Sequence, residues 1–198
     1  DVCKTAYDAY DPEYTDSIVM NPKTGEIYAM AQYPSFDLND PMKLTDLGKT
    51  NISSTWDKMT DKQKNDLANK AWKNFAITDT FEPGSIYKPI VVAMALEEGV
   101  IKSTDSFYCG GVKKIADYEI HCHNRNGHGT LSLTGVLAQS CNIGMMEIIT
   151  KLGAEKYSQY QHDFGFGEKT GIDLPNEASA SNLLYSLFSN CFKYSNIS

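Results

Sequence analysis

Residues 81–89 read Phe-Glu-Pro-Gly-Ser-Ile-Tyr-Lys-Pro and are the most informative stretch of the chain. Pro83 and Gly84 indicate the end of a loop, and the pattern that follows predicts a helix over residues 85–98. Apolar residues recur in this helix at the spacing of one face. They are Ile86, Ile90, Val91, Met94 and Ala95. We therefore expect a helix with one buried face and with Ser85 in its first turn.

Ser85 and Lys88 lie three residues apart, which places both side chains on the same side of a helix. A lysine that is partly desolvated at the start of a buried helix loses proton affinity and can accept a hydroxyl proton. The pair can therefore form a nucleophile. The alternative is that Ser85 only caps the helix and Lys88 is a solvated first-turn residue. The chemical interpretation is favoured because no other Ser-x-x-Lys occurs in the chain.

Size and charge exclude several classes of function. The chain has 198 residues, 41% of them hydrophobic, which suits one core and one domain with room for a subdomain. The net charge of -7 argues against nucleic-acid binding, which usually needs a basic face. The sequence has no apolar stretch long enough to span a bilayer and no signal-peptide pattern. Either the protein is cytosolic or its targeting part lies outside these residues.

The remaining local patterns predict a mixture of strands and helices. Two short apolar runs around Asn21-Pro22-Lys23-Thr24-Gly25 predict a β-hairpin over residues 17–31. Helical periodicity is expected at residues 60–72, 132–139, 143–152 and 154–163, and extended hairpin structure at residues 104–130. Residues 1–16 form a polar approach segment that resembles a helix end.

Five cysteines give an odd count, so at least one is free unless it pairs between chains. The predicted hairpin region holds a cluster of possible metal ligands, which are Cys109, His121, Cys122, His123 and His128. Structural zinc usually takes two close pairs of ligands, whereas Cys109 stands alone and Cys122 points away from the strand face of its histidine neighbours. A Cys109–Cys122 disulfide is the second alternative, in an oxidising compartment. We expect ordinary surface and packing residues here, without a metal.

Ser140-Cys141-Asn142 lies between two predicted helices. A serine and an asparagine at such a junction are most often caps. Together with the Ser85 stretch, however, they resemble the ordered Ser-x-x-Lys and Ser-x-Asn motifs of the penicillin-binding proteins, the class B-like D,D-transpeptidases. The opening hairpin and residues 164–175 resemble the same family, and the likeness covers roughly residues 17–180.

This resemblance implies an α/β (α+β) fold of the penicillin-binding protein and serine β-lactamase type. The fold would be incomplete, with an opening β-hairpin and a largely helical subdomain. We expect an approach segment at residues 1–16, a partial transpeptidase domain at residues 17–180 and an unassigned tail at residues 181–198.

The family's third motif is a Lys-Thr-Gly strand that lines the cleft, and neither Lys-Thr-Gly triplet of this chain is assigned to it. Lys23-Thr24-Gly25 precedes the nucleophile and is expected in a hairpin tip. Lys169-Thr170-Gly171 follows Asn142 closely and continues into Ile172, within the segment that resembles a connection. The resemblance therefore implies impaired catalysis in this chain.

The resemblance also implies a mechanism and partners. Ser85 would attack D-Ala-D-Ala stem peptides of peptidoglycan or β-lactam antibiotics, with Lys88 as its base. Ser140 would relay the proton to the leaving amine, and Asn142 would hold Lys88 and the substrate amide. No metal, organic cofactor or nucleic acid is implied.

The implied location is the extracytoplasmic face of the bacterial cytoplasmic membrane, with the membrane anchor outside this chain. The alternatives are a serine β-lactamase or β-lactam sensor, a non-catalytic remnant or interaction domain, and a generic α/β domain with coincidental motifs.

Overall fold

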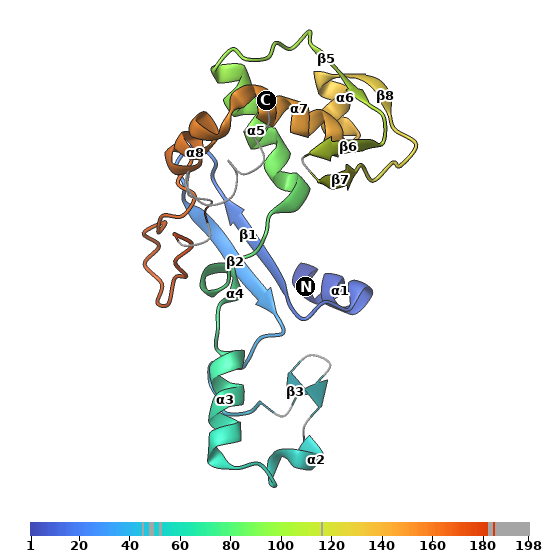
Figure 1. Cartoon of the computed structure of the whole chain (residues 1–198). Coiled ribbons are helices and arrows are strands. Elements are labelled where there is room, and N and C mark those ends of the chain that lie inside the picture. The colour runs from blue at the N-terminus through green and yellow to red at the C-terminus, as the bar shows by residue number, and fades with distance from the viewer. Residues whose placement is uncertain (45, 48–49, 52, 116, 182–183, 185–198) are drawn as a thin grey trace. The chain divides into compact units, whose positions relative to one another are not determined.

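The computed structural model describes residues 1–44, 46–47, 50–51, 53–115, 117–181 and 184 (Figure 1). The chain forms two compact units. The first contains residues 1–80 and 173–178, and the second is built on residues 81–172.

The first unit contains a hairpin and several helices. Its elements are α1 (Val2–Tyr10), β1 (Thr15–Met20), β2 (Ile27–Tyr33), β3 (Asp46–Leu47), β4 (Thr50–Asn51), α2 (Ser53–Trp56), α3 (Asp61–Ala71) and α4 (Phe75–Thr78).

The second unit is richer in helix. Its elements are η1 (Gly84–Tyr87), α5 (Lys88–Glu97), β5 (Ser106–Cys109), β6 (Val112–Ile115), β7 (Tyr118–His121), β8 (Gly129–Ser132), α6 (Leu133–Ala138), α7 (Asn142–Leu152) and α8 (Ala154–Asp163).

The predicted hairpin is confirmed as the antiparallel pair β1–β2, in which Ser17 lies opposite Ala31. Its turn is closed by a hydrogen bond from the Asn21 N–H to the Glu26 carbonyl. Gly25 has a φ of 78°, a left-handed conformation that glycine adopts without steric cost. The first Lys-Thr-Gly triplet therefore lies in a hairpin tip, as predicted. Residues 1–16, expected as an approach segment, contain helix α1, which packs on this hairpin.

The helix predicted over residues 60–72 is confirmed as α3. Its start is fixed by a capping box, in which the Thr60 hydroxyl accepts from the Gln63 N–H and the Gln63 side chain accepts from the Thr60 N–H. Asp61 lies in the first turn, where a negative charge is favourable.

The core of the second unit lies where α5 and α6 pack on α7 and where α7 covers β5. Apolar side chains from all these elements are buried, namely Val91, Val92, Ala95, Phe107, Leu133, Val136, Ile143 and Ile148. Two antiparallel strand pairs, β5–β8 and β6–β7, complete this unit in the part of the chain that the structure describes. The helices predicted over residues 132–139, 143–152 and 154–163 are confirmed as α6, α7 and α8.

One expectation was wrong in the second unit. Ile86 was placed on the buried face of the first helix, but it is 69% exposed. The reason is that residues 84–87 form a 3₁₀ turn, whose tighter winding breaks the α-helical stripe, and the α-helix begins only at Lys88. Pro89 fits this start because the first turn of a helix needs no donor from it. The Cys109–Cys122 disulfide, which was considered at that cluster only as an alternative to ordinary packing residues, is absent, since both cysteines are buried free thiols.

The close packing of α6 on α7 depends on Gly144. A Cβ atom at this position would lie 2.8 Å from Cγ2 of Val136, so the Val136 side chain or one of the helices would have to shift. We expect Gly144→Ala to lower the free energy of unfolding by about 1–3 kcal/mol, the usual cost of overpacking. Urea unfolding measures this loss. Gly135→Ala is the matched control, because its Cβ would meet ordinary contacts of 3.4 Å. Equal stability of the two variants would contradict this account of the interface.

Candidate active site

Lys88 is the central residue of the site. Its Nζ donates to the Ser140 carbonyl oxygen at 2.7 Å, to Ser140 Oγ at 2.9 Å and to Asn142 Oδ1 at 2.7 Å. A lysine ammonium has three N–H donors, so these acceptors satisfy all of them. The contacts join the start of α5 to the junction between α6 and α7. The structure therefore brings together three of the four residues predicted for the site.

Ser140 has a left-handed backbone, with a φ of 47°. It closes α6 in a Schellman motif, in which the Ser140 N–H binds the Leu137 carbonyl and the Cys141 N–H binds the Val136 carbonyl. Glycine is the usual residue at this position, because a side chain there costs roughly 1–2 kcal/mol. A strained serine whose hydroxyl contacts a lysine indicates a functional constraint.

Asn142 is the first residue of α7, and Cys141 caps that helix by accepting from the Gly144 N–H at 3.4 Å. Cys141 is fully buried, with 0% of its surface exposed. Its neighbours on either side, Ser140 and Asn142, both contact Lys88. The motif thus places its outer residues in the site and its middle residue in the core.

Ser85 lies in the η1 turn, one turn before Lys88, and is exposed. Its carbonyl oxygen accepts the Lys88 backbone N–H, which fixes the spacing of the two residues. Gly84, which precedes it, has a φ of 58°. Glycine adopts this left-handed conformation without steric cost, which lets the chain enter the turn. Among the described residues, no hydrogen bond is found for Ser85 Oγ. The hydroxyl is therefore accessible to an incoming molecule.

The Lys88 side chain is partly desolvated. Burial lowers the pKa of its amine below the usual 10.5, while the nearby Cys122 and Cys141 thiols act in the opposite direction. A lowered pKa makes the neutral amine more accessible, and the neutral amine is the form that can accept a proton.

The second Lys-Thr-Gly triplet, residues 169–171, lies in an irregular segment after α8. The Ile172 N–H donates to Thr170 Oγ1 at 3.3 Å, which is a local turn contact. Within the described part of the chain, neither triplet therefore lies on a strand beside Lys88.

A cluster of thiols lies next to the Ser-x-Asn motif and includes the middle residue of that motif, Cys141. The sulfur atoms of Cys109, Cys122 and Cys141 and a ring nitrogen of His128 lie within 4.8 Å of one another. The sequence suggests a grouping of the first two cysteines with His128 but not with Cys141, whose place in the chain is within the Ser-x-Asn motif. Only the fold reveals this grouping, because its members come from four separate segments.

The thiols of this cluster have unequal acidity. Burial would raise the pKa of Cys122, but hydrogen bonds from the backbone of Asn142, Asn124 and Ile143 outweigh it and lower that pKa. Burial raises the pKa of Cys141 to about 11, although the Gly144 N–H opposes the change.

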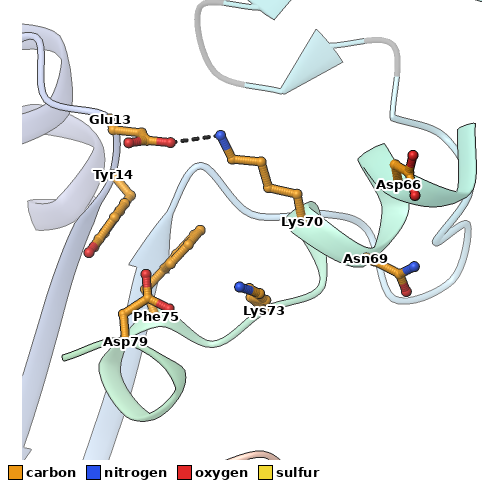
Figure 2. A pocket seen from close by; sticks show the side chains of 8 residues that line it. All are labelled: Glu13, Tyr14, Asp66, Asn69, Lys70, Lys73, Phe75 and Asp79. Carbon is orange, nitrogen blue, oxygen red and sulfur yellow. Dashed lines mark hydrogen bonds and ion pairs between the residues drawn. The ribbon is translucent and has the colours of Figure 1, made fainter. Parts of the chain in front are cut away.

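The first unit contains a separate pocket of about 420 Å³, which Figure 2 shows with its lining side chains. Two of its polar groups, Lys70 and Glu13, form an ion pair with each other at 2.7 Å. The rings of Tyr14 and Phe75 stack at 4.0 Å. None of the four motif residues lines this pocket, so it adds nothing to the candidate active site.

Residues 17–195 match the family model of the penicillin binding protein transpeptidase domain. The chain therefore belongs to this family, and both the predicted family and the predicted α+β fold class are confirmed.

Two curated relatives illustrate the likeness. The chain is 35% identical over 171 residues to Stage V sporulation protein D of Bacillus subtilis, an alignment that covers 86% of this chain and 23% of that protein. It is 30% identical over 170 residues to the peptidoglycan D,D-transpeptidase FtsI of Escherichia coli K12, covering 84% of this chain and 24% of that protein. The chain thus spans about a quarter of these relatives.

Solved structures give the same fold. A crystal structure of Pseudomonas aeruginosa PBP2 in complex with WCK 5153 aligns with a TM-score of 0.64 and 25% identity, covering 83% of this chain and 34% of that one. A peptidoglycan synthetase from Bifidobacterium adolescentis aligns with a TM-score of 0.66 and 24% identity, covering 89% of this chain and 28% of that one.

No helix in the described ranges combines the length and apolar character needed to cross a bilayer.

The left-handed backbone of Ser140 can be tested with two variants that both lack the hydroxyl. We expect Ser140→Gly to be more stable than Ser140→Ala by about 1 kcal/mol, because only glycine relieves the strain. Equilibrium unfolding in urea measures the difference. The comparison cancels the lost contact to Lys88. Equal stabilities, or a more stable alanine variant, would show that the residue is not strained.

Proposed function

We propose that this chain carries the acyl-transfer site of a peptidoglycan D,D-transpeptidase, with Ser85 as nucleophile. The observation that carries the proposal is the triple contact of Lys88 Nζ with Ser140 and Asn142. This contact holds a partly buried amine one turn from an accessible serine hydroxyl. Such an arrangement suits a base that activates a nucleophile.

In the proposed first step, the neutral Lys88 amine takes the proton of Ser85 Oγ. The oxygen then bonds to the carbonyl carbon of the penultimate D-alanine of a stem peptide. When the tetrahedral intermediate collapses, the C–N bond breaks and the terminal D-alanine leaves as an amine. Ser140, whose Oγ lies 2.9 Å from Lys88 Nζ, passes the proton to that amine.

In the second step, an amine from a neighbouring stem attacks the acyl-enzyme carbonyl. A new amide bond forms, the ester bond to Ser85 breaks and the serine recovers its proton. Asn142 keeps Lys88 in place throughout and offers its amide to the substrate. A β-lactam follows the first step alone, since ring opening leaves the acyl group on Ser85.

The family membership supports a proposal for the substrates and the location. We propose D-Ala-D-Ala stem peptides as substrates, β-lactams as inhibitors and the extracytoplasmic face of the membrane as the place of action. The curated relatives include a protein named as a peptidoglycan D,D-transpeptidase, which supports the substrate class.

We also propose that these 198 residues act slowly when expressed by themselves. The Ser85 N–H can serve as one oxyanion donor, and by family likeness the second belongs to the strand of the third motif. Neither Lys-Thr-Gly triplet lies on a strand in the described ranges. Losing one oxyanion donor typically lowers turnover by about 10²–10³-fold.

Intact mass spectrometry after incubation with benzylpenicillin tests the nucleophile. We expect one covalent adduct per chain, formed slowly, and no adduct on Ser85→Ala. Ser106→Ala, at another exposed serine, is the matched control and should keep the adduct.

The outcomes separate the alternatives. An adduct that persists in Ser85→Ala would overturn the assignment of the nucleophile. A folded chain without any adduct would favour a non-catalytic domain, whereas an adduct that is rapidly hydrolysed would favour a β-lactamase.

The pH dependence of acylation tests Lys88 as the base. Because burial lowers the pKa of this amine below 10.5, the reactive neutral form increases as the pH rises toward that lowered value. We expect the acylation rate to rise with pH and to level off below pH 10.5. Stopped-time mass spectrometry over a pH series gives this profile. Lys88→Met should show little acylation at every pH, and a wild-type rate that does not change with pH would contradict the role of Lys88.

A further inference from the structure

The turn that carries Ser85 has one partly buried side chain, that of Tyr87. Within residues 81–87, all of which the structure describes, every other residue is exposed, with Phe81 at 76% and Ile86 at 69%. The η1 turn also has no side-chain cap at its start. Because the hydrogen bonds of a 3₁₀ turn have poorer geometry than those of an α-helix, so short a turn depends on packing. Tyr87 is therefore the main anchor between this turn and the rest of the second unit.

Two aromatic rings contact Tyr87. The ring centroid of Phe166 lies 5.1 Å from that of Tyr87, with the planes at 67°, and the centroid of Tyr157 lies at 6.2 Å, with the planes at 78°. Aromatic pairs prefer such edge-to-face arrangements to a flat sandwich. Tyr87 and Tyr157 also pack against the apolar core of the unit. We call Tyr87, Tyr157 and Phe166 the aromatic cluster.

The position of Phe166 is fixed by the end of α8, which closes in a Schellman motif. The Phe166 N–H donates to the Gln161 carbonyl oxygen at 2.9 Å. The Gly165 N–H donates to the His162 carbonyl oxygen at 2.8 Å. Gly165 has a φ of 78°, which glycine adopts without steric cost. The turn after α8 therefore directs the Phe166 ring onto Tyr87.

We propose that Tyr87 is a positioning residue for Ser85, and that the aromatic cluster holds the η1 turn in its 3₁₀ form. In a 3₁₀ turn, side chains three residues apart eclipse each other, whereas in an α-helix they are offset around the axis. The 3₁₀ form therefore brings Ser85 into line with Lys88. Without the aromatic cluster the turn opens more often, and the two side chains spend less time in line. The proposal rests on Ser85 as the nucleophile and gives Tyr87 no contact with the substrate.

The Tyr87 hydroxyl indicates that the turn uses the ring and not a polar contact. Its oxygen is buried, and no hydrogen-bond partner for it is found in the part of the chain that the structure describes. A buried polar group without a partner lowers stability. Tyr87→Phe keeps the ring and removes this group, so the urea concentration at the unfolding midpoint should not fall.

Acylation by benzylpenicillin tests the positioning role. Stopped-time mass spectrometry over a series of concentrations separates the limiting rate from the half-saturating concentration. We expect Tyr87→Leu and Phe166→Leu to lower the limiting rate by about 10–100-fold, because a shift of about 1 Å in a reacting group can cost about 10²-fold. The half-saturating concentration should change little, and Tyr87→Phe should restore the limiting rate. Phe164→Leu is the matched control and should keep the rate, since Phe164 lies in the same segment but is 51% exposed.

The pH profile distinguishes positioning from loss of the base. The contacts of Lys88 Nζ with Ser140 and Asn142 do not involve the aromatic cluster. In Tyr87→Leu, the acylation rate should therefore level off at the same pH as in the wild type, but at a lower plateau. A profile that levels off at a different pH would overturn the positioning role, because the variant would then act through the Lys88 amine.

Hydrogen exchange tests the turn without any reaction. The Lys88 N–H donates to the Ser85 carbonyl oxygen across η1. We expect Tyr87→Leu and Phe166→Leu to speed the exchange of this amide, while the amides of α7 keep their protection. If the wild-type chain forms no adduct on Ser85, the proposed function fails, and the exchange rates still decide whether the aromatic cluster holds the turn.

Three further results would overturn the proposal. One is an unchanged exchange rate of the Lys88 amide, or an unchanged acylation rate, in both leucine variants of the aromatic cluster. Another is a Phe164→Leu variant as slow as Phe166→Leu, since the effect would then be a general loss of stability. The third is a Tyr87→Phe variant as slow as Tyr87→Leu, which would assign the effect to the hydroxyl and not to the ring.

Discussion

The contact of the Lys88 ammonium with Ser140 and Asn142 is the interaction on which the second unit depends. A charged amine that is partly removed from water needs its donors satisfied, and the three acceptors all come from one short junction. That junction can present them only because Ser140 accepts a strained backbone at the end of α6. The approach of α6 to α7, which requires a glycine at position 144, then sets the position of the junction on the core. The packing of α6 on α7 and the contacts of Lys88 therefore depend on the same short junction.

Local patterns predicted much of the fold. The hairpin, α3 and the helices after residue 130 follow from periodicity, turn residues and caps, which act over a few neighbours along the chain. Ser85 and Lys88 were paired for the same reason. Ile86 was misplaced because periodicity does not distinguish a 3₁₀ turn from the first turn of an α-helix. The meeting of Lys88 with Ser140 and Asn142 was inferred from family likeness, since no local rule places residues so distant in sequence together.

The thiol cluster could not be predicted from patterns among residues that are close in the sequence. Zinc motifs are recognised when ligands come in close pairs along the chain. Here each of the four candidate ligands comes from a different segment, and Cys141 was already assigned to another motif. The residue between Ser140 and Asn142 is not a neutral spacer in this chain. Its thiol is fully buried and lies within 4.8 Å of the other donor atoms of the cluster. The same three residues therefore contribute side chains both to the core and to the candidate active site.

The hairpin of the first unit has a consequence for the behaviour of the chain in solution. Apolar side chains on both strands are exposed, including Val19 at 53% and Tyr28 at 65%. In the described part of the chain, β1 and β2 pair only with each other, so each strand presents an open edge of backbone donors and acceptors. Such edges recruit further strands, and a net charge of -7 opposes this only weakly, because salt screens exposed charges. We therefore expect self-association of these 198 residues to begin at this pair of strands as the concentration rises.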